Sequence, residues 1–194
     1  MIAHLRGKLL AKRPGRVLVE AAGVGYDVVI SIPTFTQLPA EGAEAKLHIH
    51  THVREDQIAL FGFAAVEEKL LFEKLIGVSG VGPKLAITVL SGLPVEQLVG
   101  AIRGGDVAML TRTPGVGKKT AERLVLELKD KLEDLGAGAP VAAVGGAVGE
   151  DVLSALTNLG YARPAAQKAL EQVLKGSTPA EFEALFRAVI AAMR

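Results

Sequence analysis

Two short stretches of this chain carry the residue types that bind phosphate groups. Residues 79–86 read SGVGPKLA and residues 114–121 read PGVGKKTA, so Gly, Val, Gly, Lys and Ala recur at an offset of 35. Closely spaced glycines let the backbone turn tightly and approach a ligand. The helix expected after each stretch presents free backbone N–H groups and the positive end of its dipole. Each copy therefore matches the helix-hairpin-helix pattern, which binds a phosphate without reading a base.

Cations cluster at the second copy at some cost in stability. Lys118 and Lys119 lie in the first turn of the expected helix, where the dipole disfavours a cation by about 0.3–1 kcal/mol. Lys119 and Arg123 form a like-charge pair four residues apart, which costs about 0.2–0.5 kcal/mol. A bound anion would turn both costs into gains, whereas solvated lysines on plain helix connectors are the alternative. The predicted phosphate-binding residues are those of the two hairpins and the cations beside them: Ser79, Gly80, Val81, Gly82, Lys84, Gly115, Val116, Gly117, Lys118, Lys119, Arg123 and Arg54.

The second copy also resembles the end of a P-loop, the motif that holds nucleotide phosphates in ATPases. The pattern G-x-x-x-x-G-K-[ST] needs a glycine where Arg112 stands and a Ser or Thr where Lys119 stands. In the first copy, Gly77 and Gly82 have the right spacing, but Pro83 follows them instead of Lys. We therefore expect no nucleotide hydrolysis. The chain is predicted not to be an enzyme by itself and to need no cofactor, so that another subunit supplies any ATP-driven motor.

Two further groups of residues could hold a metal ion. Glu55 and Asp56 are adjacent acids in a turn expected between strands, but a metal-dependent nuclease site needs further clustered acids. From the residues alone, a solvated turn is the favoured interpretation. His48, His50 and His52 alternate with a spacing that could bind zinc, but no fourth ligand is visible nearby. We expect an exposed strand face there and no metal site.

The amino-terminal third of the chain, residues 1–63, reads as a β domain. Alternation and turn residues predict short strands over five ranges: 2–10, 16–20, 26–30, 46–53 and 57–61. A hairpin turn is expected at residues 22–25. In the fourth strand, Leu47, Ile49 and Val53 are expected to face a core. So many short strands suit a small barrel such as the OB fold, with an open sheet as the alternative.

The middle of the chain, residues 64–135, reads as helical. Apolar residues at helical spacing form three stripes: Val66, Leu70, Leu71 and Leu75; Leu85, Val89 and Leu90; Leu124, Val125, Leu128 and Leu132. The last of these helices is expected to run to about Leu135. Residues 150–194 predict three more helices, with Pro164 and Pro179 in first turns and Ser177 or Thr178 capping the last helix.

Residues 136–149 separate the two helical regions. This segment holds five Gly, one Pro and no charge, so it cannot bury enough apolar surface to offset the entropy of ordering it. We predict a flexible linker, with a buried small-residue strand at 140–144 as the alternative. The fold class expected is thus an α+β multidomain chain with domains at 1–63, 64–135 and 150–194.

Composition excludes several classes of protein. The 22 Lys and Arg balance 21 Asp and Glu to give a net charge of +1, which argues against a polycation that coats nucleic acid through bulk charge. Cysteine is absent, so there is no disulfide framework and no thiol nucleophile. No stretch approaches the ~20 apolar residues that span a bilayer. We therefore expect a cytoplasmic protein that does not associate with membranes.

In these elements and motifs, the chain resembles the RuvA family, the junction-recognising subunits of bacterial Holliday junction branch migration complexes. The matching segments follow in order along the chain: residues 1–2, 5–7, 23–26, 51–56 and 61–63, and both hairpins. Residues 114–124, PGVGKKTAERL, are the most specific stretch. The resemblance implies an OB-fold barrel, a double helix-hairpin-helix domain and a mobile, UBA-like three-helix domain.

The resemblance also implies an assembly and its partners. It implies a homotetramer that binds a four-way junction without sequence preference, with a second tetramer enclosing the junction left open. The hexameric ATPase RuvB would dock on the third domain, at residues that align with the family's motor-binding surface: Leu156, Leu159, Tyr161 and Ile190. For each of these a core position is equally compatible with the sequence. A contact with the RuvC resolvase is left open.

Glu55 and Asp56 acquire a role through the same resemblance. In the family this pair is an acidic pin that repels phosphates and helps to separate strands at the crossover. A DNA repair nuclease or glycosylase is the competing class, because helix-hairpin-helix modules accompany such enzymes. Those enzymes need a catalytic Asp or Lys in a pocket, or an acid cluster for metals. Asp106 and Asp130 have no evident partner in the sequence.

Overall fold

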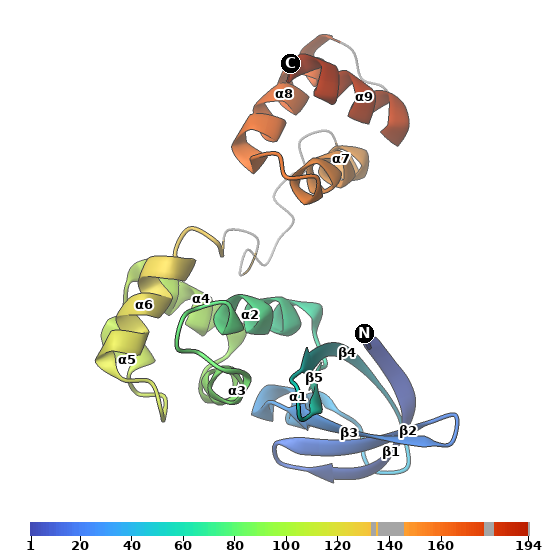
Figure 1. The fold of residues 1–194 in the computed structure, drawn as a ribbon, viewed down its shortest axis with the longest axis vertical. Coiled ribbons are helices and arrows are strands. Elements are labelled where there is room, and N and C mark those ends of the chain that lie inside the picture. Colours follow the sequence, from blue (N-terminus) through green and yellow to red (C-terminus); the bar gives the residue numbers. More distant parts are fainter. Residues whose placement is uncertain (133–134, 136–145, 177–180, 194) are drawn as a thin grey trace. The chain divides into compact units, whose positions relative to one another are not determined.

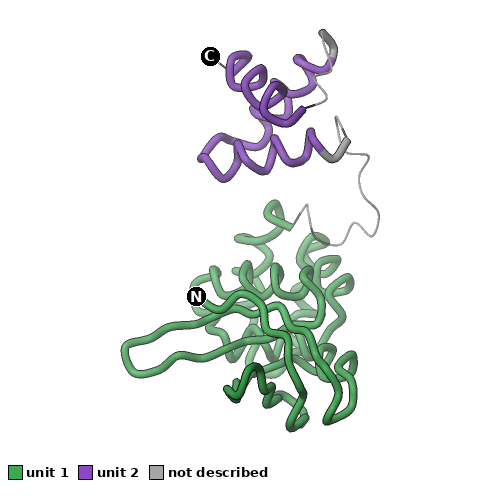
Figure 2. The backbone as a smooth tube through the Cα atoms, turned by 90° about the vertical axis from the view of Figure 1, so that its right-hand side faces the viewer, with its two compact units in different colours: residues 1–136 green, residues 137–194 purple. Residues whose placement is uncertain are grey.

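The computed structural model describes residues 1–132, 135, 146–176 and 181–193. It forms two compact units, residues 1–136 and residues 137–194, which are coloured separately in Figure 2. No single helix in the described parts of the chain has the length and apolar composition needed to cross a membrane. Two consecutive helices, Pro83–Gly92 and Val95–Gly104, meet these criteria only together, and they are bent by 102° at the break between them.

A closed five-stranded barrel occupies residues 1–63, all of which are described (Figure 1). Its strands are β1 (His4–Arg13), β2 (Arg16–Ala21), β3 (Val24–Ile30), β4 (Glu44–Val53) and β5 (Ile58–Phe63). They are ordered β1-β2-β3-β5-β4, with β3 and β5 parallel and the other neighbours antiparallel. The barrel expected from strand number and length is confirmed, and the open sheet is excluded.

The turn between β2 and β3 is tighter than expected. Ala22 and Gly23 have φ angles of 51° and 82°, the backbone that a two-residue hairpin loop requires at both central positions. Val24 and Gly25, expected in the turn, already pair with Ala21 and Glu20 across the sheet. Only two residues of the predicted four therefore form the turn.

The short helix α1 (Ile32–Gln37) connects β3 to the loop before β4 and is not expected from periodicity. Ser31 caps it by accepting a hydrogen bond from the Thr34 amide at 3.1 Å, and Pro33 lies in its first turn. This pair of signals, a capping Ser two residues before a Pro, is visible in the sequence. The helix is too short for a helical period of apolar residues to be recognised in the sequence.

Five helices follow the barrel and share one apolar core with its end. They are α2 (Val66–Ile76), α3 (Pro83–Gly92), α4 (Val95–Gly104), α5 (Val107–Leu110) and α6 (Lys118–Leu128), all within the described residues 64–132. The prediction of a helical middle region is confirmed. The expected final helix is too long, because α6 ends at Leu128; Leu132 and Leu135 are nevertheless buried in the same core.

The buried face of α2 differs from the predicted stripe. Val66 and Leu70 are exposed, whereas Leu71, Phe72 and Leu75 are buried. The reason lies in the barrel, because the Phe72 ring packs on Phe61 and Phe63 of β5, with ring centroids 5.1 and 5.0 Å apart. The buried face of α2 is therefore set by the contact of Phe72 with the barrel as well as by the leucines of the helix.

A buried polar cluster fastens α2 to α1. The Glu68 carboxylate, almost fully buried, accepts hydrogen bonds from the hydroxyl of Ser31 and from that of Thr34, the latter at 2.7 Å. The Thr34 hydroxyl in turn accepts from the Ala64 amide at 3.0 Å. Barrel and helices are thus joined by specific bonds as well as by apolar packing, which explains why residues 1–136 form one compact unit.

In the second unit, the described residues form three helices around a separate core, as expected. These are α7 (Gly146–Asn158), α8 (Arg163–Gly176) and α9 (Phe182–Ala192). Because α7 begins at Gly146, the last four residues of the predicted linker are helical. Residues 136–145 lie outside the described residues, as do Ser177, Thr178 and Pro179.

Candidate nucleic-acid interface

The two glycine hairpins have the same backbone conformation. Gly80 and Gly115 have φ angles of 87° and 83°, in the left-handed region that favours glycine. Gly82 and Gly117 then serve as N-caps of α3 and α6 with extended backbones, φ/ψ −85°/168° and −81°/168°. The sequence repeat is therefore a structural repeat, in which each copy turns the chain through a left-handed glycine and directs it into a helix.

Each hairpin is anchored through its valine. The Val81 amide donates to the Val78 carbonyl, and the Val116 amide donates to the Thr113 carbonyl, both at 3.0 Å. Both valine side chains are buried in the common core. The valine amides and side chains are therefore engaged within the protein. They fix the hairpin so that its glycines face outward.

The amides on either side of the valines are free. Within the described residues, the N–H groups of Gly80, Gly82 and Lys84 donate to no protein acceptor, and the first amide of α3 that is bonded, Ala86, donates to Gly82. The second copy repeats this pattern at the same offset, with free amides at Gly115, Gly117 and Lys119. Two equivalent groups of N–H donors at helix N-termini thus face solvent, a geometry that suits anionic oxygens.

The cations predicted to help bind phosphate differ in their surroundings. The side chains of Lys84, Lys118 and Lys119 are exposed, and Lys118 lies 4.0 Å from Glu122, one turn along α6. Such an exposed pair contributes little to stability and leaves the ammonium group accessible.

Arg123 has a structural role that the sequence does not reveal. Its Nη1 atom donates to the Ser79 carbonyl at 3.2 Å and lies 3.4 Å from the Ser79 hydroxyl. The guanidinium of α6 therefore binds the first hairpin. The second hairpin likewise lies close to the helix of the first copy, because a Cβ added at Gly115 would lie 3.1 Å from Leu85 of α3. Each hairpin lies against the helix of the other copy, which sets the spacing between the two groups of free amides.

The acidic pair occupies the tip of the hairpin between β4 and β5. Glu55 and Asp56 are the two residues between Arg54 and Gln57, which are joined by an amide-to-carbonyl bond of 2.9 Å. Both acids are exposed, and neither makes an ion pair within the described residues. Two unneutralised charges thus project together from the end of a two-stranded arm.

Beneath the tip, the expected burial of Val53 is wrong. Val53 and Ile58 lie directly opposite each other, yet they are 65% and 70% exposed. They continue the inward-facing row of the barrel that includes Leu47, Ile49 and Leu60, all of which are buried. The strands extend past the end of the barrel, so the last residues of an inward row emerge into solvent.

The histidines lie on the opposite face of β4, and they are not uniformly exposed. The His50 ring packs on Phe72 with centroids 5.3 Å apart, and its Nδ1 atom lies 3.0 Å from Glu73 of α2. His52 accepts a hydrogen bond from the Arg54 Nε at 3.1 Å, which turns Arg54 back along the strand. Among the described residues there is no group of three or more metal-ligating side chains.

In the second unit, the four residues expected to contact a partner divide into two pairs. Leu156 is fully buried in the three-helix core, which is the core position that the sequence left open, and Ile190 is partly buried against it. Leu159 and Tyr161 are 64% and 41% exposed. Leu156 lies at helical spacing from Val152 and Leu153 on the buried face of α7, and all three pack in the same core. Phe182, stacked on Phe186 at 5.6 Å, is a further exposed aromatic residue.

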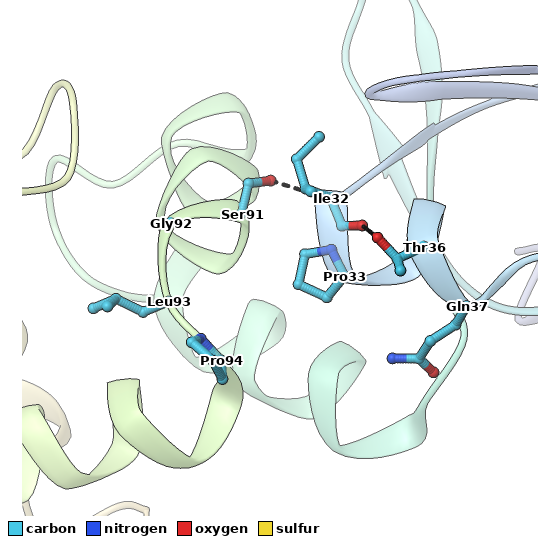
Figure 3. A pocket seen from close by; sticks show the side chains of 8 residues that line it. All are labelled: Ile32, Pro33, Thr36, Gln37, Ser91, Gly92, Leu93 and Pro94. Atoms are coloured by element: carbon cyan, nitrogen blue, oxygen red, sulfur yellow. Dashed lines mark hydrogen bonds between the residues drawn. The ribbon is translucent and has the colours of Figure 1, made fainter.

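An open pocket between the barrel and the helices lacks the residues of a catalytic site (Figure 3). Its lining comes from α1 and from the turn between α3 and α4: Ile32, Pro33, Thr36, Gln37, Ser91, Gly92, Leu93 and Pro94. The Ser91 hydroxyl accepts from the Ile32 amide at 3.1 Å and donates to the Ile87 carbonyl at 2.7 Å. With its hydroxyl so engaged and no charged group in the lining, the pocket offers no acid, base or activated nucleophile.

These features define a class: an OB-type barrel fused to a tandem helix-hairpin-helix module, with a separate three-helix unit. Comparison with known families agrees along the chain. Residues 1–62 match the RuvA N terminal domain, residues 72–130 the SAM-like helix-hairpin-helix tandem, and residues 147–194 the RuvA C-terminal domain.

Curated relatives match over all or most of the length of the chain. A protein of Acidobacterium capsulatum is 65% identical and one of Solibacter usitatus 53% identical, each over 100% of both chains. A protein of Geobacter sp. strain M21 is 51% identical over 89% of both. All three are named Holliday junction branch migration complex subunit RuvA. The chain belongs to the RuvA family.

Proposed function

We propose that this chain is the junction-recognising subunit of a Holliday junction branch migration complex. The observation that carries the proposal is the pair of equivalent hairpins, whose free amides are set side by side at helix N-termini in the same compact unit as an acidic hairpin tip. The names of the full-length relatives support it. The protein binds four-way DNA and does not itself cleave DNA or hydrolyse ATP.

The hairpins hold the DNA backbone. The amides of Gly80, Gly82, Gly115 and Gly117 donate to phosphate oxygens, and Lys84, Lys118 and Lys119 add charge around them. Backbone amides and lysines read phosphates and not base edges, so binding is independent of sequence. Arg123 contributes mainly by fixing the spacing of the two hairpins through Ser79, and Arg54 lies next to the acidic tip as a further phosphate neighbour.

Glu55 and Asp56 act as the acidic pin. Two exposed carboxylates at the end of an arm are repelled by the phosphates of an intact duplex. At the open centre of a junction the strands diverge and leave space for the tip. Repulsion from plain duplex combined with tolerance at the crossover gives selectivity for junctions, because specificity is a difference between two affinities.

Four copies of the chain assemble so that each offers the same site to one DNA arm. A ring built from one repeated contact closes into fourfold symmetry, which matches a four-way junction. A second tetramer on the opposite face of the DNA would enclose it. The three-helix unit recruits the ATPase RuvB through a surface that includes Leu159 and Tyr161, the two exposed residues of the predicted set.

Substitution of one hairpin lysine tests phosphate binding directly. Lys118→Ala should lower junction affinity, and it should reduce the slope of log affinity against log salt by about 0.9 for each phosphate that the protein no longer neutralises. Fluorescence anisotropy with a labelled four-way junction at several salt concentrations gives both quantities. Lys168→Ala is the matched control, since it removes an exposed lysine from the other unit. An unchanged slope for Lys118→Ala would remove the second hairpin from the interface.

A further inference from the structure

The β4–β5 arm carries two kinds of surface, and the acidic pin accounts for only one of them. Immediately below Glu55 and Asp56, Val53 and Ile58 form a cross-strand pair that is 65% and 70% exposed. We call this pair the apolar collar. Both residues lie on one face of the arm, and Arg54 and His52 lie bonded to each other on the opposite face.

We propose that the apolar collar packs against the exposed faces of bases at the crossover, so that the arm works as a wedge. This inference rests on the proposed function. It gives the side of the arm a contact with DNA bases, in addition to the repulsion of phosphates by Glu55 and Asp56 at the tip. Proteins that open or kink duplexes insert apolar side chains between base steps. The collar has that chemistry directly beneath the tip of the arm, beyond the buried part of the barrel.

The charge at the tip of the arm indicates which component of the DNA contacts the apolar collar. A phosphate backbone lying along the collar would come within a residue of two unneutralised carboxylates, Glu55 and Asp56. A second copy of the same arm packed on the collar would bring two such pairs together, which like-charge repulsion opposes. Bases at an open crossover are uncharged and present flat apolar faces. They are the DNA component that fits a surface of this kind beneath an acidic tip.

Selection for folding alone does not account for the collar. Val and Ile favour strands, but Thr satisfies the same strand preference and is better solvated at an exposed site. The inward row is buried as far as Leu60, and the collar lies beyond that point, so its two side chains contribute little to the barrel core. Replacing both with Thr is therefore expected to preserve the fold.

The test uses the full chain and a four-way junction carrying 2-aminopurine beside the crossover, because this base brightens when it unstacks. Binding of the unaltered protein should raise the fluorescence. The double variant Val53→Thr/Ile58→Thr should show little of that rise and bind the junction about tenfold more weakly, since each substitution removes at least one methyl group from the surface that meets the bases. Its affinity for linear duplex should not change.

The matched control is Val24→Thr, which alters a 52% exposed valine beside a different turn of the barrel. It should behave as the unaltered protein does. The single variants Val53→Thr and Ile58→Thr should each give part of the effect, and they keep the test decisive if the double variant does not fold.

The outcomes separate this inference from the function on which it rests. If the unaltered protein binds junction and duplex equally, the proposed function fails and the wedge fails with it. If it prefers the junction while the double variant matches it in fluorescence and affinity, only the wedge is overturned. If the double variant changes the oligomer mass in native mass spectrometry, the collar is a contact between copies of the chain, and the wedge is again overturned.

Discussion

At the scale of single residues, the charged groups that hold the molecule together differ from those that remain exposed at the hairpins and at the arm. Glu68 is buried and binds the hydroxyls of Ser31 and Thr34, whereas Glu55 and Asp56 carry the same charge into solvent. Arg123 binds the Ser79 carbonyl, whereas Lys118 stays accessible. None of these differences is visible in residue type, because each depends on what the fold brings within reach.

Glu68 gives a prediction about stability. Glu68→Ala should lower the free energy of unfolding of residues 1–136 by about 2–4 kcal/mol, because two buried hydroxyls are left without their acceptor and a cavity forms. Glu68→Gln should cost less, since it keeps the shape and one acceptor. Urea unfolding measures both. Glu67→Ala, an exposed acid in the same first turn of α2, is the control. Equal destabilisation by Glu67→Ala and Glu68→Ala would contradict the role given to the cluster.

At the scale of elements, the sequence predicts what local patterns determine. Strand alternation, the glycine repeat and the apolar helices are all readable, because their causes lie within a few residues. What the sequence does not reveal depends on contacts between distant segments. The orientation of α2 is set by Phe61 and Phe63, and the exposure of Val53 is set by where the barrel ends. Leu156 has the same apolar character as Leu159, and only the packing of three helices decides which one is buried.

The hairpins give a prediction at this scale. Gly115→Ala should lower the free energy of unfolding by about 1–2 kcal/mol, because it places a side chain in the left-handed region. The contact of the added Cβ with Leu85 at 3.1 Å should lower it further. Gly15→Ala is the matched control, because Gly15 has the same φ of 83° but no atom within 4 Å of the added Cβ. Thermal unfolding should show the larger destabilisation for Gly115→Ala, and only that variant should weaken junction binding. Equal destabilisation would mean that strain alone, without hairpin packing, accounts for the glycine.

At the scale of the whole molecule, a net charge of +1 is compatible with DNA binding because the charges are placed locally. Free amides and exposed lysines lie together at the hairpins, and Glu55 and Asp56 lie together at the end of the β4–β5 arm. The second unit has its own core and its own exposed apolar residues, so the proposed DNA binding and the proposed partner recruitment fall on separate parts of the chain. Under the proposed function, this arrangement holds phosphates at the hairpins and repels them at the acidic tip.

The central claim is that the chain recognises a junction, and one comparison tests it most directly. The affinity for a four-way junction is measured against that for a linear duplex of the same sequence and length, at one fixed salt concentration, with the unaltered protein and with Glu55→Gln/Asp56→Asn. The unaltered protein should prefer the junction. The variant should bind duplex more tightly relative to junction, because the repulsion of phosphates is gone. Equal affinities for junction and duplex in the unaltered protein would contradict the account, and an unchanged ratio in the variant would remove the acidic pin from it.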